Sequence, residues 1–224
     1  MSNSISRRTL FGGALAAGTG LLLTACGGGS NSSSGSSDGA VTVQQGGQGA
    51  ASPYKGINLG RTFTKPDITL TDSSGKPFNL ATGTAGKAML LYFGYTRCPD
   101  VCPTTMGDIA VAVSKLTKAQ QQQVDVVFIS TDPAQDTPTV LRKWLDAFNP
   151  DFIGLTGSMD TVIPAAKSVG VYVAAAKAGQ EPVHGAEVLG FFPSDNKAHI
   201  LYESGVEWQE YFHDLPLLIK SVPV

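Results

Sequence analysis

The chain has 224 residues, with 16 basic and 18 acidic side chains and a formal net charge of −2. This length is sufficient for one domain with a full hydrophobic core. The sequence contains no run of basic residues, which argues against nucleic acid as a partner.

The first 25 residues have the pattern of an export signal. Arg7 and Arg8 precede an apolar stretch, Leu10 to Ala25, that is short for a membrane span of about 20 residues. The stretch ends in Leu-Thr-Ala before Cys26, which resembles a lipobox whose cysteine is lipidated and becomes the new N-terminus. The twin arginine resembles a Tat signal, and a Sec lipoprotein signal with a chance arginine pair is the alternative. We therefore predict a lipid-anchored protein on the extracytoplasmic face of the cell membrane.

Residues 26–53 consist mostly of glycine, serine and glutamine. This composition cannot bury a core, so it predicts a flexible tether. Removal of residues 1–25 would take away two arginines and no acid, which leaves 14 basic and 18 acidic side chains and a net charge of −4. The folded domain is expected over residues 54–224.

Beyond the tether, strand patterns alternate with helix patterns. Residues 67–80 alternate apolar and polar side chains around Ser-Ser-Gly-Lys-Pro, which is typical of a hairpin. Continuous apolar runs at 87–95 and 123–130 predict strands buried on both faces. Helical spacing follows each run, at 103–118 and 137–148. The remaining predicted elements are a short strand at 152–155, a helix at 158–169 interrupted near Pro164, an extended segment at 171–176, a hairpin at 187–203 and a helix at 206–220 kinked or broken at Pro216.

This order of elements predicts an α/β fold with a central mixed sheet flanked by helices on both faces. It is the order of a thioredoxin-like domain with an added N-terminal hairpin and an insert. In that architecture the loop after the first core strand opens the first long helix. Cys98 and Cys102 occupy that place.

With Cys26 assigned to a lipid, Cys98 and Cys102 are the remaining cysteines. A pair this close staples too little chain to act as a structural disulfide framework. Pro103 suits the first turn of a helix, so Cys102 is expected at or next to the N-cap, where free N–H groups would lower its pKa. Two thiolates suit a soft ion, Cu(I) above all. A Cys98–Cys102 disulfide is also reachable at this spacing.

The stretch FGYTRCPDVCPTTM, residues 93–106, resembles the signature of the SCO/SenC family. Two further stretches, ISTDPAQDTP at 129–138 and GLTGS at 154–158, resemble later motifs of that family. The similarity extends over most of the chain from Asn58 onward. The resemblance implies a membrane-anchored, thioredoxin-like protein that binds copper and serves cytochrome c oxidase assembly.

Family members supply a histidine as a third copper ligand, and the matching position in this sequence is His184. The loop that carries it packs over the cysteine loop in a thioredoxin-like fold. The resemblance therefore implies an open site of Cys98, Cys102 and His184 for Cu(I), with Cu(II) as a further state. This chain departs from the family pattern beside the histidine, with Val183 in place of an acid and Gly185 in place of Ser or Thr. Loss of the acid puts the ring geometry and the Cu(II) affinity in question.

Two functions are compatible with these residues. A copper metallochaperone, which is not an enzyme, would deliver copper to the binuclear centre of the copper-bearing oxidase subunit. A thiol–disulfide oxidoreductase would instead keep the cysteines of that centre reduced through the same dithiol. His184 discriminates the two, because disulfide exchange does not require it. A peroxiredoxin is disfavoured, since Tyr95 and Leu91 stand where that family has Thr or Ser and Pro.

Neighbouring residues are expected to have lesser roles. Tyr92, Phe93 and Tyr95 should pack on the sheet and shield the cysteines. Asp132 and Asp136 are candidates for compensating charge near the site. The histidines expected to be ordinary, partly exposed residues are His199 and His213.

Overall fold

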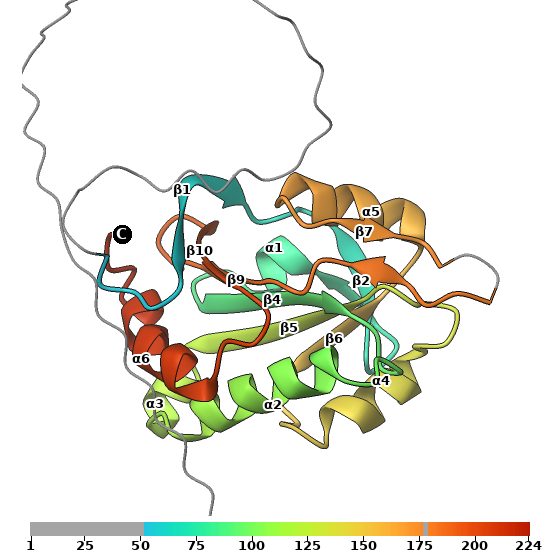
Figure 1. Ribbon diagram of the computed structural model, residues 1–224, viewed down its shortest axis with the longest axis horizontal. Coiled ribbons are helices and arrows are strands. Elements are labelled where there is room, and N and C mark those ends of the chain that lie inside the picture. The colour runs from blue at the N-terminus through green and yellow to red at the C-terminus, as the bar shows by residue number, and fades with distance from the viewer. Residues whose placement is uncertain (1–51, 177–178) are drawn as a thin grey trace, which may run out of the picture. The chain divides into compact units, whose positions relative to one another are not determined.

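The computed structural model describes residues 52–176 and 179–224, which belong to one compact unit of the chain (Figure 1). The predicted signal at 1–25, the lipidation candidate Cys26 and all but the end of the predicted tether lie outside the described residues. Within the described part of the chain, no helix combines the length and the apolar character needed to cross a bilayer.

The described strands form an eight-stranded mixed sheet in the order β1-β10-β9-β4-β5-β6-β2-β3, and a separate pair, β7-β8. Strand β5 runs parallel to both β4 and β6, whereas the other neighbouring strands are antiparallel. The strands are β1 (Ile57–Thr64), β2 (Thr69–Asp72), β3 (Pro77–Asn79), β4 (Ala88–Gly94), β5 (Val124–Ser130), β6 (Ile153–Thr156), β7 (Val173–Ala174), β8 (Val183–His184), β9 (Val188–Phe191) and β10 (Lys197–Tyr202).

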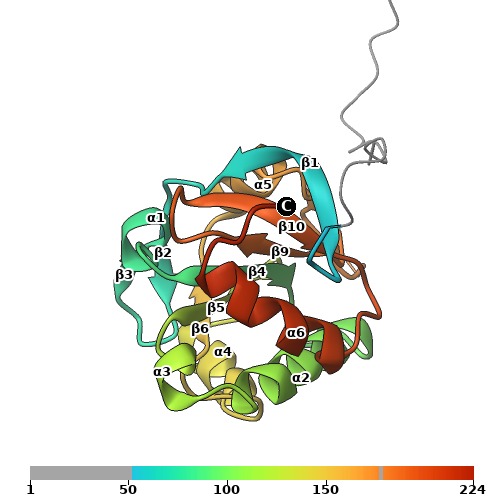
Figure 2. The same cartoon turned by 90° about the vertical axis from the view of Figure 1, so that its left-hand side faces the viewer.

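Helices lie on both sides of this sheet, as the sequence predicts (Figure 2). Helices α2, α4 and α6 cover one face, and α5 covers the other together with the short α1. The helices are α1 (Leu80–Gly83), α2 (Val101–Ser114), α3 (Lys118–Gln121), α4 (Pro138–Leu145), α5 (Met159–Ser168) and α6 (Trp208–Ile219).

Strand β4 explains why the central run is apolar without alternation. All of its residues are buried. Leu90 and Tyr92 pack into the core beneath α2 and α6, whereas Met89, Leu91 and Phe93 pack into the core beneath α5. Full burial of one such side chain contributes about 1.5–3 kcal/mol, so both faces of the strand stabilise the fold. The strand that leads into the cysteine loop is therefore buried along its whole length.

The predicted hairpin at 67–80 is formed by β2 and β3, and both predicted central strands are present as β4 and β5. The predicted interruption near Pro164 is wrong, because α5 continues through that residue, and α6 likewise continues through Pro216 without a break. A proline inside a helix removes one backbone hydrogen bond. Buried neighbours such as Val162 and Leu215 offset that loss through packing.

Strand β1, at one edge of the sheet, has no counterpart among the predicted elements. Its register with β10 shifts between Asn58 and Phe63. Gly60, with φ +63, lies inside this irregularity, in the left-handed region that favours glycine. Such a bulge interrupts the two-residue alternation that identifies a strand in sequence.

The first described residues are fixed to the last helix. The backbone N–H groups of Lys55 and Gly56 donate to the carboxylate of Asp214 at 2.9–3.0 Å, and the Tyr54 hydroxyl donates to the Val222 carbonyl at 2.7 Å. Asp214 is fully buried in α6, so these donors are needed to stabilise its buried carboxylate.

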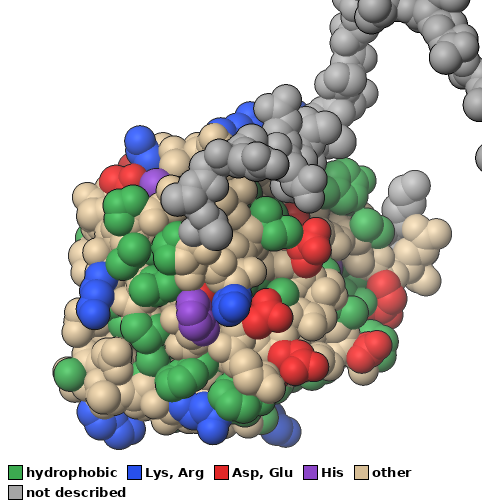
Figure 3. Space-filling model, turned by 60° about the vertical axis from the view of Figure 1, so that its left-hand side comes forward, with side chains coloured by type: hydrophobic (Ala, Val, Ile, Leu, Met, Phe, Trp, Pro, Cys, Tyr) green, Lys and Arg blue, Asp and Glu red, His purple; other side chains and the backbone are tan. Residues whose placement is uncertain are grey.

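The face shown in Figure 3 carries exposed hydrophobic side chains among charged ones, which is ordinary for a protein surface.

Candidate metal and thiol site

Cys98 and Cys102 lie at the junction between the end of β4 and the first turn of α2. The Cys98 N–H donates to the Tyr95 carbonyl at 3.2 Å, which closes the turn that leads into the helix. Both side chains are free thiols. Cys98 is half-buried, whereas Cys102 is completely buried. One sulfur of the pair is therefore accessible from solvent and the other is not.

The Cys98 sulfur lies at the open end of the helix. It accepts the backbone N–H of Cys102 at 3.4 Å. Burial opposes ionisation of this thiol, but the backbone N–H groups of Cys102, Asp100 and Val101 outweigh it, so the net pKa of Cys98 is lowered. Cys98 is the more acidic thiol of the pair.

The predicted location of the low pKa at Cys102 is wrong. Helix α2 has Asp100 as its N-cap and begins at Val101, so Cys102 lies inside the first turn with its sulfur in the core. Burial raises the pKa of Cys102 to about 12, although the hydroxyl of Tyr92 donates to its sulfur at 3.5 Å. The helix N-terminus thus acts on the first cysteine, because the second one has already turned inward.

His184 lies on β8 and faces the cysteines. Its Nε2 atom is 3.8 Å from the Cys102 sulfur. Its Nδ1 atom is 2.8 Å from the Gly185 carbonyl, which can only accept, so Nδ1 carries the proton and Nε2 presents its lone pair to the sulfur. The histidine implied by the family resemblance is thereby adjacent to Cys102, the second cysteine of the predicted pair.

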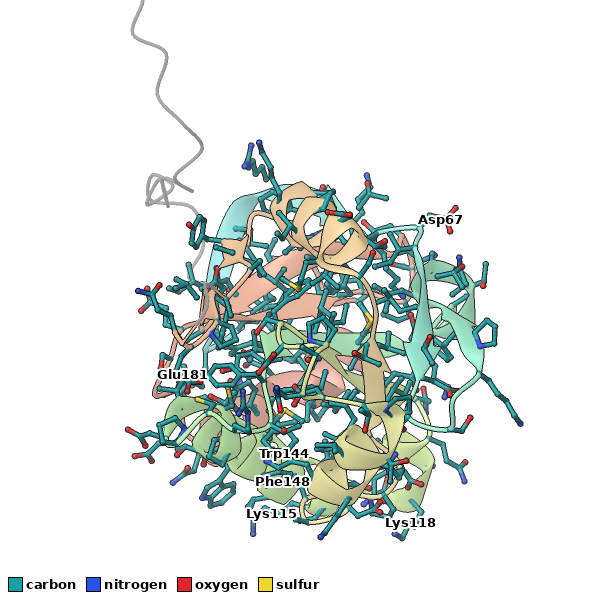
Figure 4. All side chains as sticks on the ribbon, turned by 90° about the vertical axis from the view of Figure 1, so that its right-hand side faces the viewer. Asp67, Lys115, Lys118, Trp144, Phe148 and Glu181 are labelled. Carbon is teal, nitrogen blue, oxygen red and sulfur yellow. The ribbon has the colours of Figure 1, made fainter. Side chains whose placement is uncertain are left out.

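Two tyrosines hold the imidazole in this orientation. The rings of Tyr92 and Tyr95 pack edge-on against His184, with centroids 6.1 and 5.6 Å away. Burial first, then the Cys98 sulfur and Glu181, raise the pKa of Tyr95 to about 12. Glu181 lies on the segment before β8, at the edge of the domain (Figure 4). Both tyrosines shield the site as expected, whereas the same expectation for Phe93 is wrong, because its side chain packs into the core on the opposite face of the sheet.

The departures at Val183 and Gly185 have a clear structural consequence. Val183 is 56% exposed and pairs with Ala174, while His184 pairs with Val173 on the opposite face of the two-stranded sheet. An acid at 183 is not needed to orient the ring, because the Gly185 carbonyl already accepts the Nδ1 proton. The Glu187 carboxylate occupies the space that a Cβ at position 185 would fill.

Hydrogen bonds and an ion pair made by Asp136 and Asp132 attach the cysteine loop to the end of β5 and the segment that follows it. Asp136 is fully buried and accepts the Thr96 N–H at 3.1 Å, the Thr96 hydroxyl at 2.6 Å and the Ser130 hydroxyl at 2.7 Å. Asp132 forms an ion pair with Arg97 at 2.8 Å. The two aspartates therefore fix the loop that carries the thiols.

Sequence reasoning considered these two aspartates only as nearby charges and did not identify Thr96 or Ser130. The available signal was Asp-Thr-Pro at 136–138, where Thr137 caps α4 and Pro138 is its first residue. Because Thr137 already caps the helix, the side chain of Asp136 is available to accept hydrogen bonds from the end of β5, as it does from Ser130.

The donor atoms fit a single soft metal ion. A metal–sulfur bond of about 2.3 Å and a metal–nitrogen bond of about 2.0 Å, as found for zinc, together exceed the gap between the two donors. That gap is 3.8 Å from Cys102 Sγ to His184 Nε2, so one ion can bridge them without displacing either residue. Among the described residues, however, no group of three His, Cys, Asp or Glu side chains is already gathered as a metal site. The fit therefore rests on the distance between Cys102 Sγ and His184 Nε2, and the Cys98 sulfur lies beside Cys102, whose backbone N–H it accepts at 3.4 Å.

The other histidines have structural partners elsewhere. His199 Nε2 lies 2.9 Å from Asp195 and its ring stacks on Phe192 with centroids 4.0 Å apart. His213 Nδ1 lies 2.7 Å from the buried carboxylate of Asp214. Neither residue has a thiol among these partners, which agrees with the expectation of ordinary roles.

A protein-family model described as SCO1/SenC matches residues 58–204, which is more than half of the chain. The chain belongs to the SCO1/SenC family. The sequence resemblance carried by residues 93–106 is thereby confirmed at the level of the family.

Members of the SCO1/SenC family and their structures share both sequence and fold with this chain. Mitochondrial protein SCO2 of Saccharomyces cerevisiae is 40% identical over 119 residues, which are 53% of this chain and 38% of that protein. Across three curated relatives, the chain covers 38% to 55% of the relative's length.

Solved structures cover the domain more fully. The crystal structure of Arabidopsis thaliana ScoI with copper bound has 28% identity and a TM-score of 0.63, over 70% of this chain and 98% of that one. The solution structure of apo Sco1 from Thermus thermophilus has 32% identity and a TM-score of 0.63, over 76% of this chain and 99% of that one. These likenesses confirm the thioredoxin-like fold.

Proposed function

We propose that this protein is a copper metallochaperone that binds copper through Cys98, Cys102 and His184. It would assist assembly of the binuclear copper centre in the copper-bearing subunit of cytochrome c oxidase. Membership of the SCO1/SenC family and the likeness to a copper-bound relative support copper as the cargo. The observation that carries the ligand assignment is the 3.8 Å approach of His184 Nε2 to Cys102 Sγ.

The location that we propose is the extracytoplasmic face of the cell membrane, with residues 54–224 as the working domain. Cys26 would carry the lipid and residues 26–53 would be the tether. The order of twin arginine, apolar stretch and lipobox supports this arrangement. Metabolic labelling with a radioactive fatty acid tests it: wild type should incorporate label, and Cys26→Ala should not.

The two thiols would have different duties in loading. Cys98 is half-buried and has the lower pKa, so its thiolate meets the incoming ion first. Cys102 is protonated at neutral pH, because its pKa is raised to about 12, and must release that proton as the ion binds. Its burial keeps water away from the second sulfur and slows oxidation.

His184 would close the site from the opposite side. Its Nδ1 proton is donated to the Gly185 carbonyl, so Nε2 is the ring nitrogen that faces the site and would bind the ion. A bound ion would sit between β8 and the cysteine loop, next to the half-buried Cys98. Release to a partner would proceed from that side, by exchange of one ligand at a time.

The alternative function, a thiol–disulfide oxidoreductase, is favoured by the unequal acidity of the cysteines. The Cys98 thiolate would attack a disulfide of the partner and expel one partner thiolate. The Cys102 thiolate would then attack the mixed disulfide, which releases the second partner thiol and leaves a Cys98–Cys102 disulfide. Two electrons pass to the partner and two protons balance its thiols. The proton on Cys102 makes this second step the slow one.

Replacement of His184 by Ala discriminates the two functions. If the chaperone proposal holds, His184→Ala lowers Cu(I) affinity at least tenfold in a competition titration and leaves the rate of dithiol exchange unchanged. His199→Ala is the matched control, because that histidine is occupied by Asp195. Unaltered copper affinity in His184→Ala would overturn the ligand assignment. X-ray absorption on the reduced protein with copper should show both sulfur and nitrogen at one ion per chain.

A further inference from the structure

Tyr92 reaches the candidate site from strand β4, with no part of its side chain exposed. Its hydroxyl donates to the Cys102 sulfur at 3.5 Å. Its ring meets the His184 ring edge-on, at 6.1 Å and 86°. One side chain thus touches two of the three proposed ligands.

The Cys102 sulfur has little freedom to move. A Cβ at Gly94 would lie only 3.0 Å from it, so the β4 backbone itself passes against the sulfur. The thiol accepts from Tyr92 and has the lone pair of His184 Nε2 in front of it at 3.8 Å. These two partners point the sulfur toward the imidazole.

Disulfide formation requires a different arrangement. The two sulfurs must come within about 2.05 Å of each other, with a fixed torsion about the new bond. The two thiols already lie close enough to interact, so what Cys102 Sγ would lose on oxidation is its place as acceptor for the Tyr92 hydroxyl, because a disulfide sulfur is a weaker acceptor than a thiol or thiolate. A hydrogen bond to Cys102 in the reduced form therefore opposes oxidation of the pair.

We propose that Tyr92 is a positioning residue that holds the Cys102 sulfur in the metal-binding orientation and favours the dithiol over the disulfide. This inference rests on the proposed function for its copper part only. Hydrogen bonds to a ligating sulfur tune the electronic state and the potential of a bound metal. The Tyr92 hydroxyl would withdraw charge from the sulfur and so favour Cu(I) over Cu(II).

The chain offers a matched control in Tyr95. Its ring also packs edge-on against His184, at 5.6 Å and 81°, but its hydroxyl lies near Glu181. Tyr95→Phe therefore removes a hydroxyl from the same site but leaves the hydrogen bond from Tyr92 to Cys102 in place. Both substitutions keep the aromatic ring, so both proteins should fold.

The first test is equilibration of metal-free protein with a glutathione redox buffer, followed by thiol trapping. Tyr92→Phe should shift the dithiol–disulfide equilibrium toward the disulfide by about fivefold, the factor that corresponds to one net hydrogen bond. Tyr95→Phe should stay within twofold of wild type. An equal shift in both variants, or none in either, overturns the proposal.

The second test adds a copper(II) salt and records the sulfur-to-copper charge-transfer absorption. Without the hydrogen bond the sulfur is a better electron donor, so the band of Tyr92→Phe should move to longer wavelength, and that of Tyr95→Phe should not. An unmoved band in Tyr92→Phe contradicts the copper part. If wild type gives no such band, the copper part of this inference fails, while the Cu(I) titration still decides the proposed function and the glutathione experiment still decides the role of Tyr92.

Discussion

The cysteine loop and the β7–β8 hairpin form opposite sides of one site, and they are held in very different ways. The loop is tied to the core by the buried Asp136 and its three hydrogen bonds. The hairpin has two paired positions, and its Tyr172 and Val183 side chains are 66% and 56% exposed. A firmly hydrogen-bonded cysteine loop and a hairpin with few paired residues suit a site that must bind a metal ion and later release it.

This comparison assigns separate roles to the two sides. The loop side sets the acidity of the thiols, because helix N–H groups and burial act there. The hairpin side contributes a single imidazole nitrogen, Nε2 of His184, and the Gly185 carbonyl accepts the proton on the other nitrogen. Damage to the loop should therefore cost stability and thiol chemistry together, whereas damage to the hairpin should affect metal binding alone.

Removal of the Asp136 carboxylate should have the largest effect. Asp136→Ala deletes three hydrogen bonds to a buried charge and leaves Thr96 and Ser130 without their acceptor. We expect a loss of about 3–4 kcal/mol in the free energy of unfolding. Chemical denaturation of the reduced protein measures it.

Asp146→Ala is the control for that experiment, because Asp146 is 49% exposed and pairs with Arg142 on the surface. It should cost less than about 0.5 kcal/mol. A similar loss for both variants would mean that the loop is not anchored by Asp136.

Alkylation should separate the two cysteines at pH 7. Cys98 is half-buried with a lowered pKa, while Cys102 is buried with a pKa of about 12. Because only the thiolate reacts, iodoacetamide should modify Cys98 on the order of 100-fold faster. Mass spectrometry of fragment ions assigns the modified residue. Comparable rates in the folded protein would contradict the buried position of Cys102, and urea-unfolded protein provides the reference in which both react alike.

Copper loading should depend on pH through the loop side. Cys102, with a pKa of about 12, is protonated below that value and must lose its proton to bind. Apparent Cu(I) affinity should therefore rise about tenfold per pH unit for this one proton between pH 6 and 8, and fall as pH decreases. A competition titration across this range gives the slope. His184→Ala should lower the affinity at each pH and keep a slope of at least one, and a flat profile in wild type would exclude ligation by the Cys102 thiolate.

An acid introduced on the hairpin should have the smallest effect. Val183 points away from His184, and the Nδ1 proton is already accepted by Gly185. Val183→Asp should thus leave copper affinity within about threefold of wild type, since a second acceptor for an already bonded proton adds little. The same competition titration measures it. A change of tenfold or more would show that the backbone carbonyl does not fully substitute for a carboxylate.

The sequence by itself was sufficient for the parts of the protein that local patterns encode. The apolar runs of β4 and β5, the helix after each and the close cysteine pair indicated the α/β fold and the place of the thiols. The match at residues 93–106 pointed to the family, and the family's pattern in turn pointed to His184. Strand β1 escaped prediction because its bulge at Gly60 removes the alternation on which strand prediction depends.

Only the tertiary structure decided which thiol is acidic and what supports it. The hydrogen bond from Tyr92 to Cys102 and the hydrogen bond from Thr96 to Asp136 join residues that are separated in sequence. The contact between His184 and the Gly185 carbonyl depends on a backbone direction that no sequence pattern records. Desolvation and hydrogen-bond geometry act over a few ångströms in space, whereas sequence periodicity reports only which face of an element is apolar.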